Sequence, residues 1–123
     1  MVKRAARRPD RTPPSLAKAL LAANVAESKR AEDIVVLDLR GQTLVTDFFV
    51  ICTGTNRVQI RAIMDGVAEA LTDQRGQGVR EGDETGQWVL LDHGDVVVHV
   101  FGSEARGFYR LERLWSDAPV VAR

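Results

Sequence analysis

Apolar residues recur at the spacing of one helix face in two stretches of the chain. The first stretch predicts a helix over about residues 16–28, with Ser15 as its N-cap. The second predicts a helix that follows Asn56 and runs to about residue 75, because Asn56 and Gln59 have the spacing of a capping box. The stripe that the first helix would bury consists of Leu16, Ala17, Leu20, Leu21, Asn24 and Val25.

Short runs rich in β-branched and aromatic residues, bounded by turn residues, predict strands. These runs lie at residues 34–39, 48–52, 88–92 and 95–101, and residues 79–81 add a short strand. The first two runs are almost entirely apolar, which is typical of strands that are covered on both faces of a sheet.

The last two strands form the clearest hairpin of the chain, with His93 and Gly94 at its tight turn. Side chains alternate between the two faces along a strand, so each face of the last strand has its own set of residues. One face carries Val96, Val98 and Val100, and the other carries Val97, His99 and Phe101.

A final helix is predicted for residues 104–114, with Ser103 as its cap and Phe108, Leu111 and Trp115 as its apolar contacts. The elements then follow the order α-β-β-α-β-β-β-α. That order predicts an α/β fold, in which a mixed sheet of about five strands is flanked by helices.

Charge and composition divide the chain into three parts. Residues 1–14 are predicted to be a disordered basic extension, residues 15–118 a folded domain, and residues 119–123 a tail. The first twelve residues hold five basic residues and one acid, so the remainder has a formal net charge of −4 although the whole chain is neutral. A domain with that charge is a poor general binder of phosphate backbones, and no DNA partner is expected.

The amino-terminal extension has two interpretations. An Arg-rich segment with few acids is typical of an organelle-targeting sequence. Pro9, Pro13 and Pro14 interrupt the segment early, which favours a short bacterial extension on a cytoplasmic protein. No run of the chain approaches the roughly 18 apolar residues of a membrane span, so no membrane partner is predicted.

Cys52 and Gly54 lie close together at the end of the second predicted strand. Cys52 is the only cysteine and belongs to an apolar run, so we expect a buried, inert thiol and neither a disulfide within the chain nor a cysteine-based zinc site. Gly54 precedes a helix, where a phosphate cradle could form. The segment has neither the glycine spacing of a dinucleotide site nor the lysine of a P-loop, so a strand-to-helix turn is favoured.

Acidic residues and histidines gather at two places in the sequence. Around the hairpin they are Asp92, His93, Asp95 and His99. His99 lies about 13 Å along the strand from Asp95, and aspartates beside a turn commonly bond locally, so no metal site is predicted. Asp38 and Asp47 could pair as in a two-metal phosphotransfer site, but no third acid follows at the expected place. No catalytic residue, cofactor or metal is predicted.

Two aromatic residues have the character of interface anchors, since Trp, Tyr and Arg dominate the binding energy of protein interfaces. Trp88 opens a strand after a polar, glycine-containing turn, where packing at the edge of the core is an equally open interpretation. Tyr109 follows Phe108 on a short helix, about 100° around its axis, with Arg106 and Arg110 as neighbours. The residues alone therefore predict an α/β domain with a possible interaction surface.

Five stretches of the chain, taken together and in their order, resemble the RsfS/iojap family of ribosomal silencing factors. They cover nearly all of residues 15–118, and together they are highly specific although no single one would be. The stretches are LDLRG at 37–41, TDFFVICTGT at 46–55, EG at 81–82 with GQWVLLD at 86–92, GDVVVHVF at 94–101 and FYRLERLW at 108–115.

The resemblance implies a fold similar to that of nucleotidyltransferases but without their catalytic acids. It also implies a partner, the fourteenth ribosomal protein of the large ribosomal subunit, on the face that meets the small subunit. A factor bound there prevents subunit joining and lowers translation, chiefly under nutrient limitation. Members of the family often form homodimers.

The contact surface implied by the resemblance maps onto Trp88, Asp92 and Asp95 of the hairpin and onto Tyr109 of the last helix. The aromatic side chains would supply buried apolar area, and the acids would face the basic groups of a ribosomal protein. Two alternatives stay open. One is a nucleotidyltransferase-like enzyme, which should bind nucleotide or Mg²⁺, and the other is an organelle-targeted factor acting in ribosome assembly.

Overall fold

The protein is built around one sheet with helices on both sides. The computed structural model describes residues 14–72, 78–109, 113 and 117–122. Its elements are α2 (Pro14–Ser28), β1 (Glu32–Asp38), β2 (Phe48–Gly54), α3 (Arg57–Leu71), β3 (Val79–Glu81), β4 (Trp88–Asp92), β5 (Val96–Gly102), α4 (Ser103–Tyr109) and β6 (Val120–Ala122).

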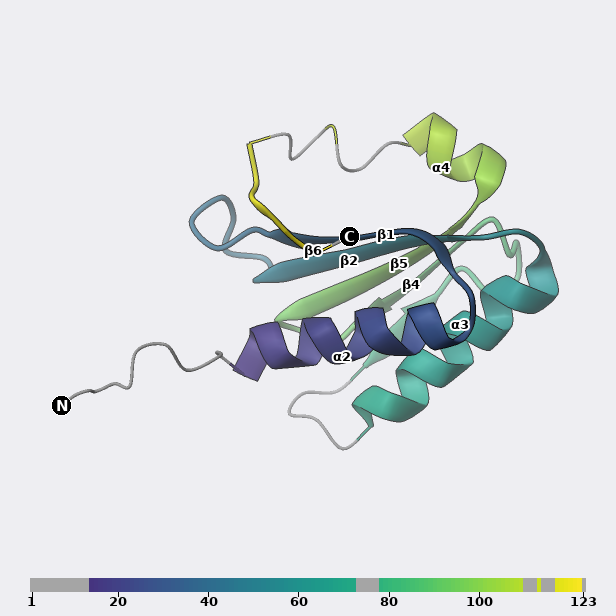
Figure 1. Cartoon of the computed structure of the whole chain (residues 1–123), viewed down its shortest axis with the longest axis horizontal. Coiled ribbons are helices and arrows are strands. Elements are labelled where there is room, and N and C mark those ends of the chain that lie inside the picture. Colours follow the sequence, from purple (N-terminus) through teal and green to yellow (C-terminus); the bar gives the residue numbers. More distant parts are fainter. Residues whose placement is uncertain (1–13, 73–77, 110–112, 114–116, 123) are drawn as a thin grey trace, which may run out of the picture.

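The sheet has six strands in the order β3-β4-β5-β2-β1-β6. The central strands β2 and β5 are parallel, and the other neighbouring pairs are antiparallel. Helices α2 and α3 lie on one side of the sheet, and α4 lies on the other (Figure 1). The predicted α/β class, with a mixed sheet flanked by helices, is therefore confirmed, with one strand more than expected.

Helix α2 buries a different face from the predicted one. Its fully buried residues include Ala19, Ala22 and Ala26, whereas Ala17 and Asn24 of the predicted stripe are exposed. Alanine lets the helix axis approach the sheet closely, so the larger apolar residues Leu16, Leu21 and Val25 pack half-buried at its flanks. The helix also begins at Pro14, so Ser15 lies inside its first turn and is not the cap.

No helix in the described part of the chain is long and apolar enough to cross a membrane.

The start of α3 confirms the predicted cap. The side-chain oxygen of Asn56 accepts a hydrogen bond from the backbone N–H of Gln59 over 2.9 Å. The Gln59 side chain accepts from the N–H of Thr55 and donates to the carbonyl of Arg30, which ties the end of α2 to the start of α3. The helix ends at Leu71, and the predicted extension to residue 75 lies outside the described residues.

The two sides of the sheet enclose two separate cores. On the side of α2 and α3 the buried residues are mainly aliphatic and include Val50 and Val98 of the central strands. On the side of α4 the core contains Ile51 and Phe101, packed with Ala105 of α4. Strand β2 is therefore buried on both faces, as predicted, and so is β5, for which no such burial was predicted. The same prediction for residues 34–39 was only partly right, because the first half of β1 is exposed or half-buried.

Cys52 is buried in the core between the sheet and the two long helices. This burial raises the pKa of the Cys52 thiol to about 12. The thiol is therefore protonated at physiological pH, which agrees with the predicted inert cysteine.

The carboxyl-terminal part of the chain departs most from prediction. Strand β6 lies in the segment expected to be a tail, and it pairs antiparallel with β1. The backbone N–H of Asp38 also donates to the carbonyl of Pro119 over 2.9 Å. Pro119 and the short run after it indicate a tail in the sequence, so only the pairing with β1 reveals this strand. The helix predicted for residues 104–114 is described as α4, which ends at Tyr109. The predictions for Leu111 and Trp115 lie outside the described residues, and so do residues 1–13 of the extension predicted for residues 1–14. Pro14 instead begins α2.

Candidate functional site

Phe49, Trp88, His99 and Phe101 form an aromatic face on the side of the sheet opposite α2 and α3. They share this side because side chains alternate along each strand and the strands pair in register. Trp88 of β4 lies directly across from Phe101 of β5, and Leu90 lies across from His99. Phe49 is on the same side of β2, across from Val97. The predicted separation of His99 and Phe101 from Val98 and Val100 is thus confirmed.

The rings of the aromatic face are in mutual contact. Trp88 stacks on Phe101, with ring centroids 5.0 Å apart and 25° between the planes. Phe49 meets His99 edge to face, with centroids 4.6 Å apart. Phe101 is fully buried, whereas Trp88 and Phe49 are only partly buried. Trp88 therefore packs against the core while part of its surface remains accessible.

His99 is a polar group inside this apolar cluster. Its Nδ1 accepts a hydrogen bond from Nε1 of Trp88 over 3.1 Å. Burial lowers the pKa of His99 to about 4, although the charge of Asp92 opposes this shift. The imidazole is therefore neutral at physiological pH.

The turn between β3 and β4 places Trp88 at the start of its strand. Gly82 has a φ of +97°, and a Cβ there would lie 2.1 Å from the carbonyl oxygen of Trp88, so only glycine fits. Arg80 forms two hydrogen bonds with Asp83 in the same turn, and a 2.7 Å ion pair with Asp65 of α3. These contacts were not predicted, although Gly82 belongs to one of the stretches that resemble the family.

Asp92 lies on the same side of β4 as Trp88, four residues further along, or about 13 Å away. It is exposed, and its Oδ1 accepts a hydrogen bond from the backbone N–H of Gly94 over 2.9 Å. This local bond fixes the carboxylate beside the turn, as expected for an aspartate at that position. Trp88 and Asp92 are thus two of the predicted contact residues that the fold places on one surface.

Asp95 is engaged with α2. Its Oδ1 accepts a 2.6 Å hydrogen bond from Nζ of Lys18, a lysine whose side chain is only 3% exposed. The same Nζ lies 2.8 Å from Nδ1 of His93. Lys18 was missed in the sequence, where a single lysine in an apolar stretch was its only signal. Tyr109 is the last residue of α4, and the predicted contact through its side chain lies outside what the structure describes.

The acids and histidines around the hairpin make separate contacts. Among the described residues no three His, Cys, Asp or Glu side chains form a group that could hold a metal ion. His93 is near Lys18, while His99 bonds Trp88. Arg40 binds Asp38 over 2.7 Å, and this hydrogen bond lowers the pKa of the Asp38 carboxyl.

Gly54 has a packing role at the end of β2. A Cβ at this position would lie 2.6 Å from Cγ1 of Ile60 and 3.3 Å from the Ile60 backbone. The chain therefore needs glycine to bring the strand end against the first turn of α3. This arrangement supports the strand-to-helix turn favoured in the sequence.

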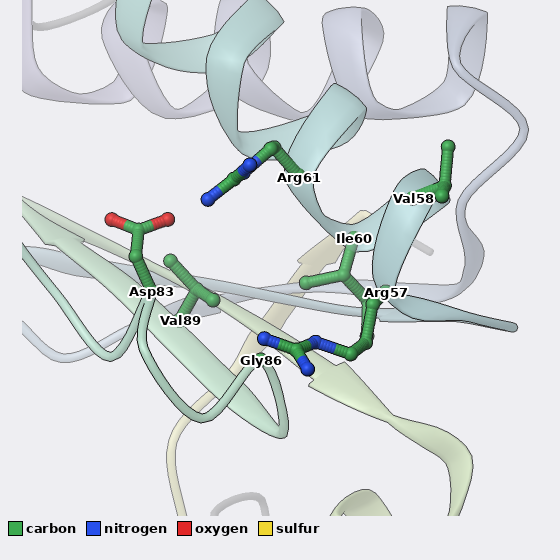
Figure 2. Close-up of a pocket in the computed structure, with 7 residues that line it drawn as sticks. All are labelled: Arg57, Val58, Ile60, Arg61, Asp83, Gly86 and Val89. Atoms are coloured by element: carbon green, nitrogen blue, oxygen red, sulfur yellow. The ribbon is translucent and has the colours of Figure 1, made fainter.

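A cavity of about 240 Å³ lies between α3 and the turn that precedes β4. Figure 2 shows Arg57 and Arg61 extending from α3 toward the side of the cavity formed by Asp83 and Gly86. Two guanidinium groups could contact a small anion, but a carboxylate stands opposite them. The cavity was not predicted, because its walls come from segments far apart in the sequence.

The fold and the aromatic face define a small α/β domain with a partly buried tryptophan on one face of its sheet. A family model described as "Ribosomal silencing factor during starvation" matches residues 12–123. The chain therefore belongs to the RsfS family of ribosomal silencing factors, as the resemblance in the sequence predicted.

Individual relatives and a solved structure agree with this assignment. The chain is 46% identical to the Bacillus subtilis protein named ribosomal silencing factor RsfS, over 82% of this chain and 86% of that one. It is 45% identical to the protein of the same name from Halalkalibacterium halodurans, over 82% of this chain and 87% of that one. A crystal structure of a Chromobacterium violaceum protein, 35% identical, matches with a TM-score of 0.77 over 81% of this chain and 84% of that one.

Proposed function

We propose that this protein represses translation by binding the large ribosomal subunit through its fourteenth ribosomal protein and sterically excluding the small subunit. It would act in the cytoplasm under nutrient limitation, as a binding protein without a catalytic step or cofactor. The observation that carries the proposal is Trp88, a partly buried indole on a sheet face of a protein that belongs to a family of ribosomal silencing factors.

The chemistry of the surface suits a ribosomal protein as the partner. A partly exposed tryptophan supplies a large apolar contact area at a small cost in side-chain entropy. Asp92 adds a fixed carboxylate on the same side of β4, which would attract the basic groups of a ribosomal protein. The net charge of −4 outside the first twelve residues favours contact with protein over contact with RNA. Asp95 and Tyr109 remain predicted contacts, and Asp95 would have to serve Lys18 and the partner together.

A sedimentation experiment tests the proposal. Purified protein is mixed with isolated large subunits, small subunits are added, and joined ribosomes are separated from free subunits. Wild-type protein should co-sediment with large subunits and reduce joining. Trp88→Glu should do neither, because it places a charge in a contact that binding would desolvate, at a cost of several kcal/mol.

Val58→Glu is the matched control for this variant. Val58 is 80% exposed on α3, on the other side of the sheet, so the same charge there should leave binding intact. Equal loss in both variants would mean that the aromatic face is not the contact. If wild-type protein sediments alone and joining is unaffected, the proposed function is wrong.

Asp92 is tested by its effect on the rate of association. Asp92→Asn keeps the oxygen that accepts from Gly94 but removes the charge. Binding should become slower and less dependent on salt, while dissociation changes little. Stopped-flow measurements at two ionic strengths separate these effects, and an unchanged association rate would remove Asp92 from the contact.

The alternatives have their own tests. For a nucleotidyltransferase-like enzyme, the cavity beside Arg57 and Arg61 is the place to seek an anionic nucleotide. Calorimetry that measures binding of nucleoside triphosphates and Mg²⁺ tests this alternative. The assembly factor would co-sediment with incomplete large subunits in preference to mature ones. Sedimentation equilibrium of the free protein tests whether it forms the homodimer that the family resemblance implies, and repeating it with large subunits shows whether the dimer competes with ribosome binding.

A further inference from the structure

The hydrogen bond between Trp88 and His99 determines the state of the imidazole. The indole Nε1–H is the donor and Nδ1 of His99 is the acceptor, 3.1 Å apart. Because Nδ1 accepts, the proton of the neutral ring lies on Nε2. A protonated ring would carry a hydrogen on Nδ1 as well and could not accept from the indole.

The second ring nitrogen of His99, Nε2, lowers the stability of the folded protein. His99 is 5% exposed, and its Nε2 has no hydrogen-bond partner among the described residues. A buried N–H group without an acceptor opposes folding. Leucine would fill a comparable volume without that cost, so stability alone does not account for a histidine at this position.

Contacts with Phe101 and His99 orient the indole of Trp88 on the aromatic face. Stacking on Phe101 sets the plane of the ring. The hydrogen bond to His99 sets the rotation within that plane, because it requires Nε1 to point at Nδ1. A side chain that is already ordered loses little freedom when a partner binds, whereas ordering one on binding weakens affinity by up to about tenfold.

We propose that His99 is a positioning residue, whose Nδ1 holds the Trp88 indole in the orientation in which it meets the protein partner. The inference rests on the proposed function, since it concerns how the same surface binds. His99 itself lies beneath the surface and acts through Trp88.

Two substitutions at position 99 separate the effect of the hydrogen-bond acceptor from the effect of side-chain packing. His99→Leu removes the acceptor and also removes the unpaired Nε2. His99→Asn keeps an acceptor oxygen near the place of Nδ1. Affinity for isolated large subunits should fall about tenfold in His99→Leu and recover in His99→Asn. Urea unfolding should show that His99→Leu is about as stable as wild-type protein. If His99 had only a structural role, the loss of affinity would be accompanied by a loss of stability.

The free protein provides a direct readout of the contact. In wild-type protein the Trp88 indole N–H should give a nuclear magnetic resonance signal that exchanges slowly with solvent, identified by its absence in Trp88→Phe. His99→Leu should shift that signal and speed its exchange, and His99→Asn should restore both. An indole signal that is unchanged in His99→Leu would overturn the proposal.

A double-mutant cycle tests whether His99 acts through the indole. Phenylalanine has no N–H, so in a Trp88→Phe background His99→Leu should cause no further loss of affinity. An equal loss in both backgrounds would overturn the proposal, because His99 would then affect binding by another route. If the indole signal responds as expected but wild-type protein does not bind large subunits, the proposed function fails, and the positioning role in partner binding fails with it.

Discussion

The two faces of the sheet are built on different principles. The face under α2 and α3 is lined mainly with aliphatic side chains, and Val50, Val98 and Val100 are fully buried there. The aromatic face keeps Trp88 only partly buried and encloses His99 with an unpaired Nε2. The first face is what folding alone favours, since it removes apolar surface from water and leaves few polar groups unsatisfied. The second carries features that folding does not need, which is why we propose it as the binding face.

The largest expected effect lies on the helix-covered face. Ile63→Ala removes a fully buried side chain of α3 and should lower the free energy of unfolding by about 2–5 kcal/mol. Affinity for large subunits, measured per folded molecule, should not change. Trp88→Glu should lose stability too, because it removes the stacking on Phe101 and the hydrogen bond to His99, but it should also abolish affinity per folded molecule. If affinity per folded molecule falls equally in the two variants, the comparison between the faces breaks.

Acid should destabilise the folded protein through His99 of the aromatic face. Because the pKa of His99 is about 4 in the folded protein and near 6.5 when unfolded, the unfolded state binds more protons between these values. The stabilisation from keeping His99 neutral is therefore fully present above pH 6.5 and falls by about 3 kcal/mol on acidification to pH 4. Urea titrations at pH 7, 5.5 and 4 should show this slope in wild-type protein. His99→Leu should lack it, and equal slopes in the two proteins would contradict the assigned cause.

Lys18 sharpens the comparison, because it is a buried charge associated with the helix-covered side. Lys18→Met leaves Asp95 without its ion-pair partner and should lower the free energy of unfolding by about 1–3 kcal/mol. The exposed residue Lys29 provides a control, and Lys29→Met should have little effect. Thermal unfolding measures both. Stability that is unchanged in Lys18→Met would show that the ion pair contributes nothing.

The smallest effect concerns the cap of α3. Asn56→Ala removes the acceptor for the N–H of Gln59 and should cost about 1 kcal/mol of stability. Asn56→Asp keeps the acceptor and should retain most of that stability. Neither variant should alter affinity for large subunits, because α3 lies on the other side of the sheet. A clear loss of affinity in Asn56→Ala would instead indicate that the start of α3 contributes to partner binding.

The sequence predicted the parts of the fold that depend on local patterns. The strands of the hairpin, the alternation of Val98 and His99 along β5, and the cap at Asn56 all agree with the structure. The buried face of α2 was wrong because alanines at its centre carry little signal, although they allow the closest approach to the sheet. Strand β6 was missed because Pro119 and the short run after it indicated a tail, and only the pairing with β1 reveals a strand there.

The predicted contact residues fared differently from one another. Trp88 and Asp92 lie on one side of β4, as strand alternation requires for residues four apart. Asp95 was predicted from the resemblance to the family, and the structure shows that it also contacts Lys18, a residue 77 positions away in the chain. No local pattern indicates such a pair, because it depends on how α2 packs against the hairpin.

The sequence by itself determined the class of fold, the two-sided character of β5 and the family, since these follow from periodicity and from motifs in a fixed order. The tertiary structure alone decided how each side chain is used. It placed Nδ1 of His99 against the Trp88 indole and left Nε2 without a described partner. It also directed Asp95 toward Lys18 and positioned Gly82 against the Trp88 backbone. The physical reason is that these contacts join different elements, and their geometry exists only once the strands have paired and the helices have packed.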